Sequence, residues 1–263
     1  MERICWVDGR LRAVGEACVR ADDSAYEEGR GCYTSAHVQA GEVRFEARHV
    51  QRLVRDARAL ELGEVDADAA RRALRELADA AFGDGDGVVR LQASRDAAGR
   101  VRLVATARAL GDDPSEWTAI RAPQRHDGGV VPGGPKLTNR LALALAADAA
   151  RRAGAQEALL FDGEERLVEG ARTNAIVVTE PGDLLTPPLE RGGVAGIARA
   201  IALERIPELR EGDVAAQDLF SAREIVVVNA VRGARSIATL DGRSIGGPQR
   251  PMHARLAEAL ERG

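Results

Sequence analysis

The sequence predicts an α+β protein built from two domains. Its 263 residues are enough for one large domain or two of ordinary size. Runs with strand-like alternation and runs with helical spacing follow one another along the chain. The stretch Gly111-Asp112-Asp113-Pro114-Ser115 interrupts this pattern and is typical of a linker. We therefore expect a small N-terminal domain over residues 1–113, a linker over 114–118 and a C-terminal domain over 119–263.

Strand and helix signals alternate through the first half. Asp8-Gly9 lies between two short apolar runs and predicts a hairpin over residues 5–14. Alternation predicts a strand over Cys32–Gln39, and apolar residues at helical spacing predict a helix over Glu46–Leu60. Asp66 is a good N-cap, so a second helix is expected from there to Phe82. The remaining elements expected in this half are a turn or short helix at 22–31 and strands at 43–45, 88–94 and 101–107.

The second half contains more strands than helices. The Gly/Pro-rich segment from Gly128 to Pro135 predicts a loop. A helix is expected from Leu137 to Ala153, because Gly154 supplies a C-terminal stop. The other elements expected here are strands at 117–122, 157–161, 166–169, 173–178, 184–189 and 224–229, and helices at 197–205 and 252–260.

The composition argues against several classes of protein. The net charge is -4, and no basic run is interleaved with aromatic residues, which disfavours a general nucleic-acid binder. No apolar run approaches about 18 residues and the N-terminus lacks a signal-peptide pattern, so neither a membrane span nor a signal peptide is expected. The three cysteines, Cys5, Cys18 and Cys32, lack CxxC spacing and indicate a reduced, cytoplasmic protein without a metal site.

Lys136 is the only lysine in the sequence, and every other strong base is an arginine. Arginine can replace lysine in ion pairs and on solvated faces, but its guanidinium stays protonated and cannot form an imine. A desolvated lysine can lose its proton and attack a carbonyl. The position that kept its lysine is therefore a candidate for Schiff-base chemistry, against the alternative that one lysine survived by chance.

Three other features match the remaining parts of one cofactor. Glycines at 192, 193 and 196 precede a predicted helix, whose free N–H groups can bind a phosphate. Arg52 lies on the first predicted helix, where it is either a surface residue or a phosphate ligand. Glu169, if buried beside a heterocyclic nitrogen, would hold that nitrogen protonated. An imine-forming lysine, a phosphate site and a carboxylate for a ring nitrogen are the three requirements of pyridoxal 5′-phosphate.

These residues stand in an order that resembles the class IV, fold-type-IV pyridoxal-phosphate enzymes, and the resemblance covers nearly the whole chain. The family includes branched-chain aminotransferases, D-amino acid transaminases and aminodeoxychorismate lyases. It implies a small N-terminal α/β domain, a larger C-terminal pseudo-barrel domain and a homodimer with the active site near the subunit interface. The matching segments are Gly31–Thr34, His49–Leu53, Lys136–Arg140, Glu157–Asp162, Glu169–Asn174, Leu185–Pro188, Gly196–Arg199 and Asn229–Gly233.

The resemblance assigns roles to individual residues. It implies that Lys136 forms the imine and that Glu169 pairs with the pyridine nitrogen. Phosphate is then held by Arg52 and by the segments around Gly196 and Asn229. The full set of cofactor-binding residues expected from the resemblance is Arg52, Lys136, Arg140, Glu169, Asn174, Ile197, Ala198 and Ala230. Some positions depart from the common pattern: Ala198 replaces a threonine, Asn229-Ala230-Val231 lacks hydroxyls as in the lyases, and Arg30 replaces an acid.

The substrate is predicted from the groups that could bind a carboxylate. Arg30 and Arg90, with Tyr33, are the candidate substrate-binding residues, because two arginines at one site mouth suit an α-carboxylate. We therefore expect a transaminase that moves an amino group between an amino acid, the D series included, and a 2-oxo acid such as 2-oxoglutarate. The alternative is aminodeoxychorismate lyase, which makes 4-aminobenzoate and pyruvate. A binding protein without catalysis is disfavoured by the retained Lys136.

Overall fold

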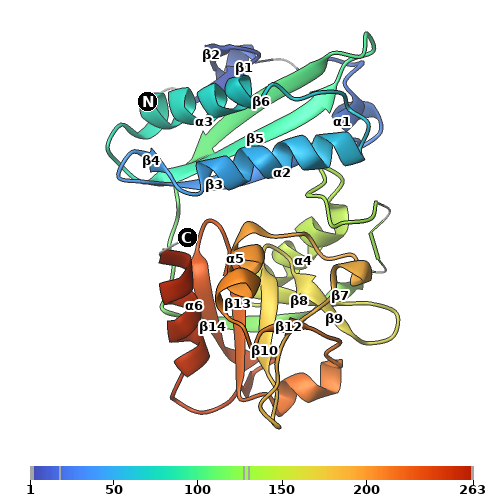
Figure 1. Cartoon of the computed structure of the whole chain (residues 1–263), viewed down its shortest axis with the longest axis vertical. Helices are drawn as coiled ribbons and strands as arrows, with labels where there is room; N and C mark the ends of the chain where they lie inside the picture. The colour runs from blue at the N-terminus through green and yellow to red at the C-terminus, as the bar shows by residue number, and fades with distance from the viewer. Residues whose placement is uncertain (1–2, 18, 127, 130, 262–263) are drawn as a thin grey trace. The chain divides into compact units, whose positions relative to one another are not determined.

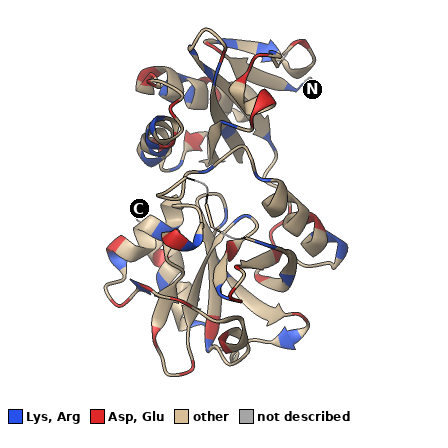
Figure 2. Cartoon of the chain, turned by 90° about the vertical axis from the view of Figure 1, so that its right-hand side faces the viewer, with Lys and Arg blue, Asp and Glu red and all other residues tan. Residues whose placement is uncertain are grey.

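A computed structural model describes residues 3–17, 19–126, 128–129 and 131–261, so Cys18 and part of the predicted 128–135 loop lie outside the described residues. The chain divides into two compact units. Unit 1 comprises Met1–Asp112 together with Pro135–Asn139, and unit 2 comprises Asp113–Gly134 together with Arg140–Gly263. Segments rich in Lys and Arg are interspersed with segments rich in Asp and Glu on both units (Figure 2).

Unit 1 is a six-stranded antiparallel sheet covered by two helices (Figure 1). Its strand order is β2-β1-β6-β5-β3-β4. Helix α2 packs on β3, helix α3 packs on β1, β5 and β6, and the two helices contact each other. The elements are β1 (Ile4–Val7), β2 (Arg10–Ala13), a 3-10 turn η1 (Val14–Glu16), α1 (Ser24–Glu27), β3 (Cys32–Gln39), β4 (Glu42–Val43), α2 (Glu46–Ala59), α3 (Ala67–Phe82), β5 (Gly87–Arg95) and β6 (Val101–Arg108).

Local sequence signals account for most of unit 1. The Asp8-Gly9 turn has positive φ at both residues, as the predicted two-residue hairpin requires. The Asp66 side chain accepts hydrogen bonds from the N–H groups of Asp68 and Ala69, which confirms the predicted N-cap of α3. The apolar faces of α2 and α3 are buried against the sheet, with Leu53 fully covered.

Unit 2 is a curved, nine-stranded mixed sheet. Its main path is β12-β11-β10-β13-β14-β7-β8-β9, with β15 paired to β14. Strands β9 and β10 also contact each other, so the sheet curls back into a partly closed barrel, in agreement with the expected pseudo-barrel. The strands are β7 (Glu116–Arg125), β8 (Glu157–Phe161), β9 (Leu167–Gly170), β10 (Asn174–Val178), β11 (Leu184–Thr186), β12 (Arg210–Glu211), β13 (Glu224–Asn229), β14 (Gly233–Leu240) and β15 (Arg243–Ser244).

The helices of unit 2 pack on different parts of this sheet (Figure 1). Helix α4 packs on β7 and β8, where Ala146 and Ala150 meet Ala158 and Leu160 in a small apolar cluster. Helices α5 and α6 contact β13 and each other. Their bounds are α4 (Leu141–Arg152), α5 (Ile197–Arg205) and α6 (Pro251–Glu261), with 3-10 turns η2 (Leu189–Arg191) and η3 (Ala216–Phe220). No helix among the described residues is long and apolar enough to cross a membrane.

The structure differs from the sequence prediction around Lys136. The predicted helix from Leu137 begins only at Leu141, because the Thr138 N–H donates to the Gly31 carbonyl and Leu137 forms a bridge with Cys32. These contacts place Pro135–Asn139 in unit 1, whereas we expected them in the C-terminal domain. In the expected linker over 114–118, β7 already begins at Glu116. Elements β12, β14, β15 and η3 were not predicted.

Candidate active site

Lys136 is held on both sides of its backbone within unit 1. Its N–H donates to Asp56 Oδ2 at 2.9 Å, and its carbonyl accepts from the Tyr33 N–H at 2.9 Å. Asp56 is fully buried on α2, and its other carboxylate oxygen pairs with Arg55 at 2.7 Å. Both anchors are independent of the lysine side chain. The backbone that carries the amine is therefore fixed while the amine itself stays available.

Tyr33 lies between two cations of unit 1. The Arg90 guanidinium stacks over the Tyr33 ring, with its carbon 3.7 Å from the ring centroid. Lys136 Nζ lies 5.0 Å from the same centroid. Both distances are in the range of cation–π attraction. Two of the predicted substrate residues and the predicted nucleophile therefore share one cluster, whereas Arg30 pairs with the exposed Glu28 at 2.8 Å.

Arg52 is buried on α2, contrary to the alternative of a surface residue. Burial lowers the pKa of Arg52 to about 10, against the opposing effect of the Asp56 carboxylate. Its Nη2 donates to Thr34 Oγ1, which also lies 2.5 Å from His49 Nδ1. Burial, with the nearby Arg52 charge, holds the pKa of His49 well below its usual value. Arg52 Nε is buried without a hydrogen-bond partner among the described residues. A cation held in this way can serve an anionic ligand.

Glu169 is the corresponding anionic group of unit 2. It lies on β9 and is 2% exposed. Its Oε2 accepts hydrogen bonds from the Val194 N–H at 2.9 Å and from Asn174 Nδ2 at 3.3 Å. Asn174 Nδ2 also donates to the Val194 carbonyl at 2.8 Å. The carboxylate is thus fixed by β10 and by the loop that precedes α5.

The second oxygen of Glu169 tests whether this site fits a pyridoxal ring. Glu169 Oε1 is buried and has no hydrogen-bond partner among the described residues. A buried carboxylate oxygen without a donor is costly unless a ligand supplies one. A protonated ring nitrogen is such a donor. The residues present therefore fit the pyridoxal ring. Lys136, the only lysine of the sequence, fits the aldehyde of the cofactor.

The glycine-rich loop before α5 lies close against its neighbours in unit 2. A Cβ atom at Gly196 would stand 2.0 Å from Asn174 Oδ1, so only glycine fits there. A Cβ at Gly134 would stand 2.5 Å from the Gly193 carbonyl oxygen. Gly196 is the N-cap of α5 and offers no side-chain cap to the N–H groups of the first turn, which includes Ile197 and Ala198. This helix start can therefore bind an anion.

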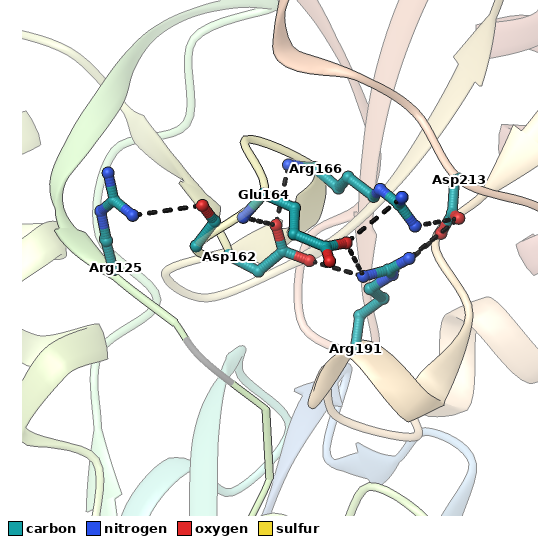
Figure 3. A network of polar contacts seen from close by, with 7 residues as sticks. Arg125, Asp162, Glu164, Arg166, Arg191 and Asp213 are labelled. Carbon is teal, nitrogen blue, oxygen red and sulfur yellow. Dashed lines mark hydrogen bonds and ion pairs between the residues drawn. The ribbon is translucent and has the colours of Figure 1, made fainter.

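A polar network anchors the other end of this loop (Figure 3). Arg191, the last residue of η2, makes two 2.9 Å contacts with Asp213, through Nε and Nη2. Its Nη1 also reaches Asp162 Oδ2 at 2.9 Å and Glu164 Oε2 at 3.2 Å in the β8–β9 turn. The network ties the start of the glycine loop to the hairpin that carries Glu169.

The remaining predicted residues of unit 2 lie at element ends. Ala230 follows β13 in a turn held by Asn229 Oδ1, which accepts the N–H groups of Val231 at 2.9 Å and Arg232 at 2.7 Å. Arg140 is the residue before α4. The predicted site residues thus fall into two groups: Lys136, Arg52, Tyr33, Arg90 and Arg30 in unit 1, and Glu169, Asn174, Ile197, Ala198, Ala230 and Arg140 in unit 2.

Two further residues contact these groups and were not predicted from the sequence. Asp56 lies four residues after Arg52, a spacing that places both on one helix face and could have identified it. His126 Nε2 lies 3.6 Å from Glu169 Oε1, and no local pattern indicated this contact.

Comparisons with known proteins show which family the chain belongs to. The model of the amino-transferase class IV family matches residues 31–240. The chain is 27% identical to a bifunctional aminodeoxychorismate lyase / D-amino acid transaminase from Mycobacterium tuberculosis, over 97% of this chain and 96% of that protein. It resembles the crystal structure of 4-amino-4-deoxychorismate lyase from Pseudomonas aeruginosa, with a TM-score of 0.84, 28% identity and 98% of each chain covered.

A third similar protein is a branched-chain aminotransferase from the archaeon Thermoproteus uzoniensis, crystallised with norvaline. Its structure gives a TM-score of 0.86 and 26% identity, with 100% of this chain and 94% of that chain covered. The fold and the family match define a class of enzyme that acts on small amino and keto acids. The chain belongs to the amino-transferase class IV family, whose cofactor is pyridoxal 5′-phosphate.

Proposed function

We propose that this protein is a transaminase that moves an amino group between an amino acid, D-amino acids included, and a 2-oxo acid such as 2-oxoglutarate. The observation that carries the proposal is the cluster of Lys136, Tyr33 and Arg90 in unit 1, which combines the amine with a guanidinium beside one buried aromatic ring. Arg90 provides a bidentate partner for the α-carboxylate of an amino acid. Arg30 remains a second candidate for this carboxylate.

The proposed cofactor ligands are those that the family resemblance implies. Lys136 would hold the cofactor covalently through its amine, and Glu169 Oε1 would accept a hydrogen bond from the protonated ring nitrogen. Arg52, the first-turn N–H groups at Ile197 and Ala198, and the turn at Ala230 would bind the phosphate. Asn174 keeps Glu169 in position, and Arg140 is a further proposed cofactor ligand. The bound cofactor supplies the electron sink that makes the α-proton of the substrate removable.

Lys136 would also be the acid–base group of the reaction. Its Nζ would take the proton from the substrate Cα as a general base and give it back as a general acid. This transfer requires that the amine lie near the substrate Cα. The two backbone anchors of Lys136, at Asp56 and Tyr33, fix the backbone that carries this amine.

Aminodeoxychorismate lyase is the second candidate. It is favoured by the Asn229-Ala230-Val231 turn, which lacks the hydroxyls common in transaminases, and by the relatives that carry this activity. Both reactions use the same cofactor ligands, so these ligands do not separate them. The choice between the two reactions depends on the residues that bind the rest of the substrate.

Cofactor attachment is the first test. Reconstituted wild-type protein should absorb visible light and gain the mass of the cofactor on borohydride reduction. Lys136→Arg, which keeps the positive charge but cannot form an imine, should show neither. An exposed control, Arg71→Ala, should behave as wild type. A wild type that neither absorbs nor gains mass would exclude both candidate reactions.

An amino-donor screen separates the two activities. Both enantiomers of alanine and glutamate are offered with 2-oxoglutarate or pyruvate, and the exchanged pair is quantified by chromatography. The same preparation is given aminodeoxychorismate and assayed for 4-aminobenzoate. Exchange supports the transaminase, whereas 4-aminobenzoate without exchange supports the lyase. Arg90→Ala should raise KM for the amino donor about 10- to 100-fold, with Arg71→Ala as control.

The family resemblance also leads us to propose a homodimer. Sedimentation equilibrium of the purified protein should then give twice the mass of one 28.0 kDa chain. A monomeric mass at every concentration would contradict this.

A further inference from the structure

His126 is a side chain near the Glu169 carboxylate that has no role in the proposed function. Its Nε2 lies 3.6 Å from Glu169 Oε1, the buried oxygen that has no hydrogen-bond partner among the described residues. This separation is an ion-pair distance and is longer than a hydrogen bond. The two side chains are 18% and 3% exposed, so their interaction is weakly screened by solvent. His126 therefore acts on the same oxygen that would receive the ring nitrogen.

The fold places His126 there through the end of β7. The pairing of β7 with β8 shifts register between Arg121 and Arg125, and His126 follows directly after the last paired residue. The His126 N–H donates to the Phe161 carbonyl at 2.9 Å, and its own carbonyl accepts from the Gly128 N–H at 3.1 Å. On the other side of β8, Glu169 pairs with Leu160. His126 thus reaches Glu169 across the end of β8, from a backbone that is fixed at two points.

We propose that His126 is a positioning residue for Glu169, which holds the Oε1 end of the carboxylate in place for the protonated ring nitrogen of the cofactor. Oε2 is already fixed by Val194 and Asn174, but these donors leave the other oxygen unsupported. A carboxylate oxygen has two lone pairs, so Oε1 can face His126 and a ring N–H at the same time. The inference rests on the proposed function, because it requires Glu169 to meet that nitrogen.

This role differs from a purely structural one in a measurable way. A structural histidine would affect every ligand of the site equally. A residue that acts through Glu169 should change the affinity only for a ligand with a protonated ring nitrogen. Pyridoxal 5′-phosphate and its 1-deaza analogue, in which a C–H replaces that nitrogen, have the same aldehyde and phosphate and differ at this point.

The test measures dissociation constants of both compounds for the apo-protein by ultrafiltration. His126→Leu should bind pyridoxal 5′-phosphate about tenfold more weakly than wild type, equivalent to ~1.4 kcal/mol, and the deaza analogue equally well. His126→Gln, which keeps an N–H donor at a similar reach, should recover most of the loss. His253→Leu is the matched control. His253 is also partly buried in unit 2, but it contacts the Ala234 carbonyl instead.

The outcomes are distinguishable. Equal losses for both compounds in His126→Leu, or tighter binding of pyridoxal 5′-phosphate, would overturn the inference and leave the proposed function intact. A wild type that binds neither compound would overturn the proposed function itself. If His126→Leu does not fold, as judged by circular dichroism, His126→Ala takes its place on the two compounds: a loss confined to pyridoxal 5′-phosphate supports the role, and equal losses or no loss contradict it.

Discussion

The hydrogen bond from the Lys136 N–H to Asp56 gives a prediction that does not depend on the cofactor. Asp56→Ala removes the charged acceptor of this N–H. Hydrogen bonds to charged groups contribute about 1.5–3 kcal/mol. The Arg55 ion pair is lost as well, but Arg55 is half exposed and this pair contributes little. Buried Arg52 also loses the carboxylate that offsets its burial, so the loss at Lys136 has to be measured at the Lys136 amide itself.

Amide hydrogen exchange of the apo-protein measures this effect at one residue. If exchange follows the local opening equilibrium, the Lys136 amide should exchange about 10- to 150-fold faster in Asp56→Ala, the rate equivalent of 1.5–3 kcal/mol. Asp56→Asn keeps an acceptor oxygen and should fall between this variant and wild type. Asp66→Ala removes an aspartate that caps α3 in the same unit and should leave Lys136 unchanged. An unchanged Lys136 amide in Asp56→Ala would refute the anchoring role.

Three further predictions concern charge and burial elsewhere. Burial raises the pKa of Glu157, so the folded state holds this proton more tightly than the unfolded chain, and the contribution is lost as pH rises. The free energy of unfolding of Glu157→Gln in urea should therefore increase relative to that of wild type between pH 4 and pH 7. A difference that stays constant with pH would contradict this. Arg191→Ala should lower the free energy of unfolding by about 1 kcal/mol at low salt, and by less at 1 M salt because salt screens ion pairs. An equal loss at both salt concentrations would contradict a role for ion pairing. Burial raises the pKa of Cys32 to about 12, so iodoacetamide at pH 8 should leave Cys32 unmodified until the protein unfolds, as peptide mass spectrometry would show.

Elements with complete local signals were predicted to within a residue or two. The strand at Cys32–Gln39 alternates between small or apolar and polar residues, and α5 follows the glycine N-cap at Gly196. Both have the same bounds in the structure as in the prediction. In these segments the backbone hydrogen bonds and the buried face are determined by neighbouring residues, so a local pattern is sufficient.

The prediction errors occur where the local structure depends on residues that are distant in the sequence. The segment after Lys136 has helical spacing, but the Thr138 N–H donates to the Gly31 carbonyl, which lies 107 positions earlier. Strand β14 carries serine, arginine and small residues, so its sequence has no strong strand pattern. It nevertheless pairs with β13 on one side and with β7 on the other. His126 was missed for the same reason, since its contact with Glu169 depends on a register shift in β7.

The candidate site residues are organised by contacts inside their own units. Asp56 and Tyr33 fix the backbone of Lys136 within unit 1, whereas Val194, Asn174 and His126 surround Glu169 within unit 2. A ligand that meets groups already held in place does not have to order them, and its binding energy is not reduced by that entropy. The backbone of Lys136 and the carboxylate of Glu169 are therefore fixed without a ligand. If they bind the cofactor as proposed, substitutions at their supporting residues should weaken cofactor binding even though these residues need not touch the cofactor.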